Sequence, residues 1–250
     1  MQSFINAQPI SRYQWRVVIL CFLIVFLDGL DTAAMGFIAP ALSQDWGIDR
    51  ASLGPVMSAA LIGMVFGALG SGPLADRFGR KVVLVGAVLL FGAFSLASAY
   101  STNVDQLLVL RFLTGLGLGA GMPNATTLLS EYTPERKKSL LVTSMFCGFN
   151  LGMAGGGFIS AKLIPAFGWH SLLLIGGILP LILTVVLLFW LPESARYLVV
   201  RNRGTDKVRK ALAPIDPTVV AQASSFSVPE QKTVKARNVF AVIFSGTYST

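Results

Sequence analysis

The sequence predicts an all-α integral membrane protein with six transmembrane helices and a cytoplasmic N-terminus. The first indication is composition, because 54% of the 250 residues are hydrophobic and only 13% are charged, whereas soluble domains carry about 25% charged residues. The second is that the apolar residues gather into six runs, each near the roughly 20 residues that cross a bilayer as a helix. The third is that charged and turn residues gather in the short links between these runs. Together these features favour a membrane-spanning helical bundle.

The apolar runs set the expected elements in order along the chain. A cytoplasmic N-terminus is expected at residues 1–16, followed by a transmembrane bundle over residues 17–190. The expected spans are residues 17–39, 53–74, 82–100, 106–129, 140–163 and 170–190. The polar and basic stretch 191–238 is expected to be a central cytoplasmic linker. A further apolar run, 239–250, is expected to begin a seventh transmembrane helix that is truncated at Thr250.

Basic residues determine the orientation, because Lys and Arg concentrate on the cytoplasmic side of membrane helices. With the N-terminus in the cytoplasm, seventeen of the twenty Lys and Arg residues lie on that side. Arg50 and Lys162 fall on the other side, and Arg111 lies within a span. The net charge of +8 therefore reflects residues that flank membrane helices. No nucleic-acid partner is expected.

The sequence contains no motif of an enzyme or of a cofactor site. The stretch GLGLGAG fails the spacing of a dinucleotide fingerprint and lies inside an apolar span. Cys21 and Cys147 both lie in apolar runs, which suggests neither a disulfide framework nor a zinc site. We therefore expect no catalytic residues, no cofactor and no metal. The glycines of the second, fourth and fifth spans indicate close helix packing instead.

Two carboxylates interrupt the first span in the stretch LDGLDTAAMG, where they stand at Asp28 and Asp31. An Asp at the centre of a membrane helix costs on the order of 2.5–3.5 kcal/mol on insertion scales. Counting from Arg16, Asp28 lies roughly 18 Å into the span, near the midplane, and Asp31 follows on the same face. Because two such carboxylates repel, at least one is expected to hold a proton reversibly. The pair is a candidate proton-coupling site; the alternative is that both only pair with polar groups of a neighbouring helix.

Arg111 in the fourth span is the expected counter-ion. Its guanidinium can pair with Asp28 or Asp31, or it can hold the carboxylate of an anionic substrate in a bidentate fork. A purely structural salt bridge is the alternative. Ionisable residues inside a membrane are expensive, so they usually mark a functional site.

The link between the second and third spans reads GPLADRFGRKVVL, from Gly72 to Leu84. It resembles the signature of the major facilitator superfamily at every defined position of that signature. RFLTGLG, which begins at Arg111, and LPESARYL after the sixth span are similar to further motifs of the same family. The fifth span lacks the Gly-Pro pattern of drug antiporters. The resemblance implies that the six helices are the N-terminal half of a twelve-helix fold whose other half is a C-terminal six-helix bundle.

The resemblance also implies a conformational gating motif at the cytoplasmic end of the bundle. Asp76 is expected to face the positive N-terminal end of a helix in the other half, and Arg77 and Arg80 to pair with acids near the inner end of the fourth span, with Glu131 as the candidate. The alternative is a short charged link that only anchors two helices. The residues of this motif are Gly72, Asp76, Arg77, Gly79, Arg80 and Glu131.

Within the superfamily, DGLDT and the stretch RFLTGLGLGAGMPN followed by SEYTPER resemble the aromatic acid:proton symporters. That resemblance implies a multi-pass protein of the bacterial inner membrane that imports hydroxybenzoate or hydroxyphenylpropionate together with a proton. It also implies roles for Asp28, Asp31 and Arg111 in proton coupling and substrate binding, with the lipid bilayer as the other partner. The alternatives are a proton symporter for a sugar or a non-aromatic acid, and a non-transporting membrane sensor.

Overall fold

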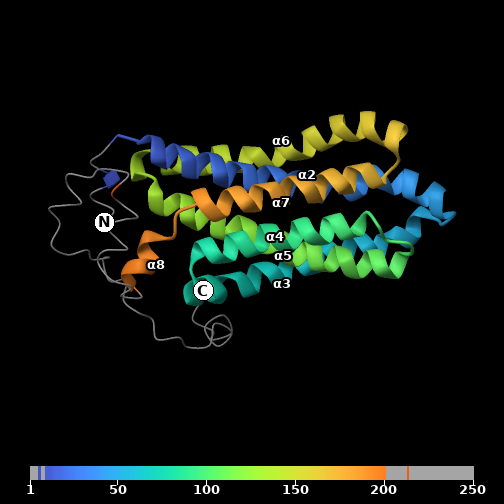
Figure 1. Cartoon of the computed structure of the whole chain (residues 1–250), viewed down its shortest axis with the longest axis horizontal. Helices are drawn as coiled ribbons and strands as arrows, with labels where there is room; N and C mark the ends of the chain where they lie inside the picture. Colours follow the sequence, from blue (N-terminus) through green and yellow to red (C-terminus); the bar gives the residue numbers. More distant parts are fainter. Residues whose placement is uncertain (1–4, 7–8, 201–212, 214–250) are drawn as a thin grey trace, which may run out of the picture.

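The computed structural model describes residues 5–6, 9–200 and 213, and all regular structure in them is helical. Six long helices follow one another along the chain (Figure 1). Their bounds are α2 (Arg12–Trp46), α3 (Gly54–Phe78), α4 (Arg80–Ser98), α5 (Val104–Tyr132), α6 (Glu135–Phe167) and α7 (His170–Trp190). A short 3₁₀ helix, η1 (Arg50–Leu53), precedes α3, and a short helix, α8 (Ala195–Val200), follows α7.

Each of the six predicted spans coincides with one of these helices, and all six are long and apolar enough to cross a membrane. Several helices extend past the apolar runs because polar residues at their ends satisfy the free backbone groups. The helix α2 begins with a capping box between Ser11 and Gln14 and ends at Gly47 in the left-handed conformation. The chain is a multi-pass membrane protein. Of the predicted linker, residues 191–200 are described; 201–238 (except 213) and the predicted seventh helix at 239–250 lie outside the described residues.

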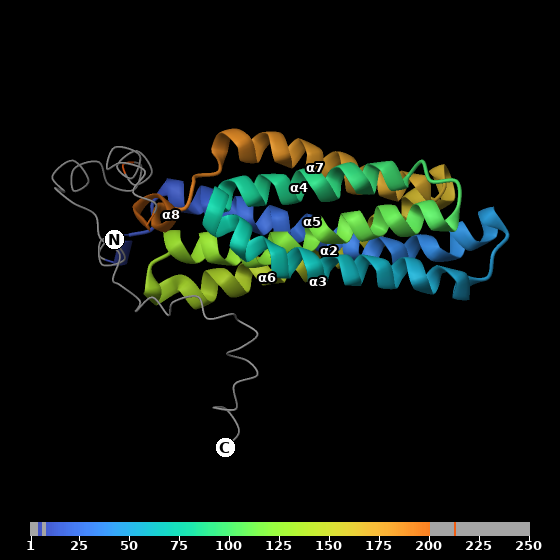
Figure 2. The same cartoon turned by 90° about the horizontal axis from the view of Figure 1, so that it is seen from below.

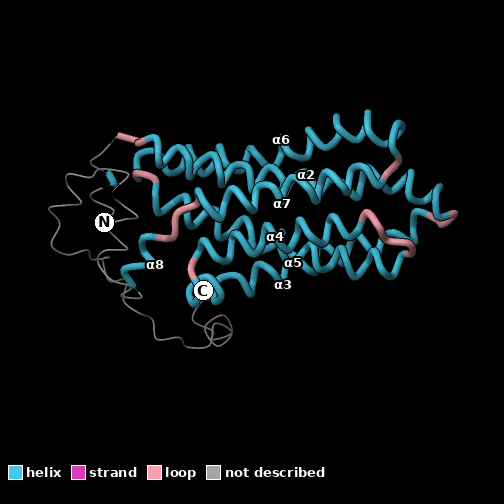
Figure 3. The backbone as a smooth tube through the Cα atoms, in the orientation of Figure 1, coloured by secondary structure: helices cyan, strands magenta, loops and turns pink. Residues whose placement is uncertain are grey.

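The helices run side by side along one long axis (Figures 1 and 2). All links between them lie at the two ends of the bundle (Figure 3). One end carries the start of α2, the α3–α4 and α5–α6 links and α8. The main contacts pair α3 with α5, α2 with α6, and α4 with both α5 and α7.

Glycines bring the paired helices into backbone contact. A Cβ atom added at Gly119 of α5 would lie 2.0 Å from the carbonyl oxygen of Met64 in α3. A Cβ atom at Gly152 of α6 would lie 1.9 Å from the carbonyl oxygen of Phe26 in α2. Such close approach is available only to residues without a side chain. The two pairs α3–α5 and α2–α6 are therefore fixed at a spacing that larger residues would not permit.

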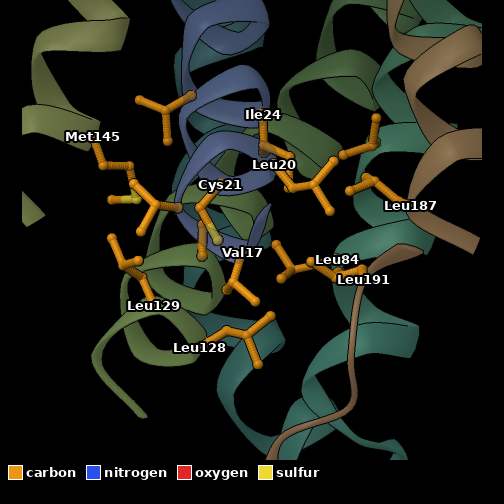
Figure 4. Close-up of a cluster of buried hydrophobic side chains, with 14 of the residues drawn as sticks. Val17, Leu20, Cys21, Ile24, Leu84, Leu128, Leu129, Met145, Leu187 and Leu191 are labelled. Atoms are coloured by element: carbon orange, nitrogen blue, oxygen red, sulfur yellow. The ribbon is translucent and has the colours of Figure 1, made fainter. Parts of the chain in front are cut away.

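Two apolar clusters fill the bundle, one toward each end. The first cluster gathers around α2 residues from Val17 to Leu27, as Figure 4 shows for the part with Cys21, Ile24, Met145 and Leu187. The second contains α2 residues from Ala34 to Leu42 and packs on Trp169 and Leu107. The short stretch of α2 between the two clusters contains both aspartates. The fold thus places the charged residues in mid-helix, between two layers of apolar packing.

Candidate functional site

A buried ion pair joins α2 to α5 at the centre of the bundle. Arg111 Nη1 lies 3.2 Å from Asp31 Oδ2, and only 1% of each side chain is exposed. Arg111 is among the largest fully buried side chains of the described residues. Of the two partners that the sequence left open for Arg111, the structure selects Asp31.

The helix α4 supplies two serine hydroxyls to this pair. Ser98 Oγ accepts hydrogen bonds from Arg111 Nε at 3.2 Å and from Nη2 at 2.9 Å. The hydroxyl of Ser98 in turn donates to the carbonyl oxygen of Phe94 at 2.7 Å. Ser95 Oγ donates to Asp31 Oδ1. Both oxygens of Asp31 and three N–H groups of Arg111 therefore have partners.

The helix α7 leaves room for this cluster. A Cβ atom added at Gly176 would lie 3.3 Å from Asp31 Oδ1 and 3.3 Å from Ser95 Oγ. Contacts of that length are tighter than ordinary van der Waals packing, so a glycine fits here best. Four helices, α2, α4, α5 and α7, thus converge on one polar cluster inside an apolar bundle.

Asp28 has a different environment from Asp31, although it is one helical turn away and only 1% exposed. Its Oδ1 accepts a hydrogen bond from Thr32 Oγ1 at 3.3 Å. Its Oδ2 is buried and has no hydrogen-bond partner within the described part of the chain. The cluster therefore contains one fully partnered carboxylate and one that is only half satisfied.

A cavity of about 110 Å³ opens beside the ion pair. Asp31, Thr32 and Arg111 form its polar end, and apolar residues of α2, α3 and α5 form the rest of the wall. These apolar residues are Met35, Met57, Ala60, Leu61, Met64 and Leu118. Small-molecule sites usually enclose about 300–1,000 Å³. The lining of this cavity therefore suits a small anion with an apolar body, but its volume is only part of that of a usual small-molecule site.

The predicted gating residues meet at the end of the bundle where α3 passes into α4. Arg80 Nη2 lies 3.2 Å from Asp76 Oδ1, and Arg80 Nη1 donates to the buried Asn124 of α5 at 2.9 Å. Asp76, Arg80 and Glu131 line a second cavity, of about 610 Å³. Through Asp76 and Arg80 the motif thus connects α3, α4 and α5.

The expected pairing of Arg77 or Arg80 with Glu131 does not occur in this conformation. Arg80 binds Asp76 because the tight turn at Gly79 brings the two side chains together, and Arg77 lies 5.2 Å from the ring of Phe78. Glu131 instead accepts a hydrogen bond from Ser194 Oγ at 2.5 Å. Glu131 and Arg80 share a cavity without forming an ion pair.

Glu193 is a residue of this end that the sequence reasoning did not single out. Its Oε1 accepts from the backbone N–H of Lys81 at 3.1 Å and so satisfies a free donor at the start of α4. Gly79 has a φ of 103°, and a Cβ atom there would lie 2.4 Å from Glu193 Oε2. Gly72, by contrast, faces open space. The conformation at Gly79 and its contact with Glu193 explain why that motif position is glycine.

Ser95 and Ser98 were also missed by the sequence reasoning, although a signal was present. They stand three residues apart in FSLAS within an apolar span, so they share a helix face. Nothing in the sequence alone identifies the helix that this face meets. In the structure this face of α4 packs against α5 and α7, which brings the two serines to Asp31 and Arg111.

A family model described as the Major Facilitator Superfamily matches residues 21–250 of the chain. The chain belongs to this superfamily. A proton:xylose symporter of known structure has the same fold, with a TM-score of 0.73 at 23% sequence identity, over 86% of this chain and 52% of the symporter. The signature sequence in the α3–α4 link and the six-helix fold therefore both fit this superfamily.

The chain is similar over its whole length to transporters of aromatic acids. It is 88% identical to a 4-hydroxybenzoate transporter of Pseudomonas putida over 248 residues, which are 99% of this chain and 55% of that relative. It is 52% identical to a gallate transporter of Pseudomonas putida over 96% of this chain and 54% of that protein. The chain spans about half the length of the curated relatives it matches. The resemblance to aromatic acid transporters, first noted in DGLDT, is confirmed.

Proposed function

We propose that the chain forms the N-terminal half of a transporter that imports small aromatic carboxylates together with a proton. The substrates would be of the hydroxybenzoate or hydroxyphenylpropionate type, and the location the bacterial inner membrane. The observation that carries the proposal is the buried Arg111–Asp31 pair at the end of an apolar cavity, with Asp28 beside it. The names of the relatives support the substrate class.

The cavity offers both parts of an aromatic carboxylate a suitable contact. Met35, Met57 and Met64 line its apolar wall, and methionine sulfur packs favourably against aromatic rings. Arg111 at the polar end can donate to a carboxylate through the N–H groups that Asp31 and Ser98 do not occupy. A neutral sugar could accept hydrogen bonds from the guanidinium but would gain no charge pairing from it. The arrangement therefore favours an acid with an apolar body.

Charge balance gives a reason for proton coupling. With both aspartates ionised, the cluster of Asp28, Asp31 and Arg111 carries one net negative charge. An incoming carboxylate adds a second, which is costly in a region of low dielectric. One proton taken up with the substrate restores the original charge. Substrate and proton thus enter the site together more easily than either does alone.

Alternating access requires a partner bundle, which the C-terminal half of the transporter would supply. In transporters of this kind the site lies near the midplane between two repeats. The Asp76–Arg80 region, at the end proposed to be cytoplasmic, would contact the other half in one state and release it in the other. Residues 1–16 would then lie in the cytoplasm, with 191–238 as the linker and 239–250 leading into the second half.

The test is uptake of labelled 4-hydroxybenzoate by transport-deficient cells that express the full-length protein. We expect accumulation that a protonophore abolishes and that unlabelled gallate reduces. Accumulation that a protonophore leaves unchanged would contradict proton coupling. Absence of uptake of every aromatic acid tested, from protein shown to reach the membrane, would contradict the substrate class.

The second candidate is a proton symporter for a sugar, which the likeness to the proton:xylose symporter and the LPESARYL segment favour. The same cells distinguish the two candidates. Uptake of labelled xylose without uptake of 4-hydroxybenzoate would favour the sugar. A protein that transports neither, nor any related acid, would fit a membrane sensor.

A further inference from the structure

We infer that the two aspartates do different jobs: Ser95 and Ser98 hold Asp31 and Arg111 together as a lasting ion pair, and Asp28 carries the coupled proton. This division of roles rests on the proposed function and refines it. It assigns α4, which carries no charged residue at the midplane, the task of positioning the site.

The contacts of Asp31 favour its ionised form. One of its oxygens faces the guanidinium of Arg111, and the other accepts the hydroxyl of Ser95. Hydrogen bonds and an opposite charge directed at a carboxylate both stabilise the anion. A proton on Asp31 would also leave Arg111 as a buried charge without its partner, which is strongly unfavourable. Asp31 is therefore poorly suited to take up and release a proton in each cycle.

The contacts of Asp28 favour its protonated form. Its single hydrogen bond, from Thr32, leaves Oδ2 buried without a partner. Asp31, a like charge, lies one turn away on the same helix, and Arg111 of α5 is bound to Asp31 and Ser98. A buried, half-satisfied carboxylate is costly as an anion, and binding a proton removes that cost.

The neighbouring helix α6 offers Asp28 no compensating charge. Gly148, Phe149 and Gly152 of α6 lie against this stretch of α2, and the charged residues of α6 stand at 135–138 and 162, away from that contact. On α7, Gly176 lies against the cluster, and the helix contains no Asp, Glu, Lys or Arg. Asp28 thus depends on a proton for neutrality, whereas Asp31 depends on Arg111.

Ser98 is the residue that keeps Arg111 turned toward Asp31. Its oxygen accepts hydrogen bonds from two N–H groups of the guanidinium, and its hydroxyl donates to the carbonyl oxygen of Phe94. Without this hydroxyl the guanidinium would be free to turn toward Asp28, where it would compete with the proton for the carboxylate. Ser98 is therefore a positioning residue that keeps Asp28 available for the proton.

The first experiment separates binding from coupling in the full-length protein. Counterflow of labelled 4-hydroxybenzoate needs the substrate site but no net proton movement, whereas accumulation needs both. Asp28→Asn is expected to retain counterflow, with a rate that no longer varies with pH, and to lose accumulation. Asp31→Asn is expected to lose both. Counterflow retained in Asp31→Asn and lost in Asp28→Asn would reverse the roles, and identical behaviour of the two variants would show that the aspartates act as one unit.

The second experiment does not depend on the substrate. An infrared difference spectrum of the purified full-length protein between neutral and alkaline pH reports a protonated carboxyl group inside the bundle. Its band is expected to vanish in Asp28→Asn, because the remaining carboxylate of the cluster, Asp31, stays paired with Arg111. A band that vanishes only in Asp31→Asn would overturn the inference even if aromatic acids proved not to be the substrate. Failure of wild-type uptake with the expected spectrum would instead contradict only the proposed function.

The third experiment tests Ser98. Loss of hydrogen bonds to a charged group corresponds to roughly a tenfold to hundredfold change in affinity, so Ser98→Ala should raise KM by about that factor and shift the pH profile of uptake. Ser98→Thr, which keeps the hydroxyl, should restore both. Ser144→Ala is the matched control, because Ser144 also bonds the carbonyl four residues back but lies exposed on α6. An unchanged KM and pH profile in Ser98→Ala would contradict the positioning role.

Discussion

Two ion pairs of this bundle have the same length and opposite surroundings. The nitrogen–oxygen distance is 3.2 Å in both Arg111–Asp31 and Arg80–Asp76. In the first pair 1% of each side chain is exposed, whereas in the second 20% of Arg80 and 74% of Asp76 are exposed. The distance alone therefore does not tell which pair contributes more to stability. The surroundings of each pair decide what its loss costs and what the pair can do.

Burial makes the central pair expensive to break, and exposure makes the other pair easy to exchange. Removing one partner of a buried pair typically costs about 3–5 kcal/mol, whereas exposed pairs are worth about 0.2–1 kcal/mol. A pair that must open in each transport cycle is better placed where water can replace its partner. The exposed pair suits a gate, and the buried pair suits a permanent part of a binding site.

The largest effect is expected where the buried pair is broken. Arg111→Gln leaves Asp31 buried without its cation, so unfolding of the purified full-length protein should become easier by about 3–5 kcal/mol, and uptake should be lost. The double variant Arg111→Gln with Asp31→Asn removes both charges and should recover most of that stability without recovering uptake. Thermal unfolding in detergent measures the first effect. Equal stability of the single and double variants would contradict the assigned pairing.

A smaller effect is expected where α5, the helix that carries Arg111, is forced away from α3. In Gly119→Ala the added Cβ atom would lie 2.0 Å from a backbone oxygen of α3, so α3 and α5 must separate around Gly119, about two helical turns from Arg111. Such overpacking typically costs about 1–3 kcal/mol. Gly86→Ala is the control, because nothing lies within 4 Å of its Cβ position. A melting temperature that falls equally in both variants would exclude the helix contact as the cause.

A still smaller effect on stability is expected at the contact that supports the exposed pair. Glu193→Ala removes the acceptor for the first turn of α4, and loss of such a cap costs about 1 kcal/mol. Uptake should slow because the Arg80 region loses its fixed position, while KM should stay unchanged because the cavity is distant. The initial rate of uptake at several substrate concentrations separates the two parameters. A raised KM with an unchanged maximal rate would contradict this assignment.

The smallest effect on stability is expected from the exposed pair itself. Asp76→Asn should change the free energy of unfolding by less than about 1 kcal/mol, since water replaces the lost partner. If the residue belongs to a gate, the rate of uptake should nevertheless fall. A loss of stability as large as that of Arg111→Gln would remove the distinction between the two pairs.

The sequence was sufficient for the helices and for the presence of a charged site, but not for the details of its contacts. Long apolar runs and capping residues determine where helices lie, so all six were predicted. Asp28, Asp31 and Arg111 were recognisable because charge is rare inside a membrane. The choice of Asp31 over Asp28, and the contribution of Ser95 and Ser98, depend on how the helices rotate about their axes. That rotation follows from backbone contacts such as those at Gly119 and Gly152, which no local pattern specifies.

The end of the bundle that carries α8 shows the opposite case, in which a local signal was sufficient. Asp76 and Arg80 are four residues apart across the turn at Gly79, so their pairing was accessible from spacing alone. The expected pair with Glu131 required a long-range contact, and Ser194 occupies that position instead. Local pairing therefore prevails at this end over the expected long-range contact.

The most direct test of the coupling site is proton movement driven by the substrate. 4-Hydroxybenzoate would be added to de-energised cells in weakly buffered medium, with cells that lack the transporter as the control for passive entry of the acid. Wild-type full-length protein should make the medium alkaline beyond that control as protons enter with the substrate, and Asp28→Asn should not. Alkalinisation of equal size in Asp28→Asn, or none in a wild type that accumulates the acid, would contradict proton coupling at this site.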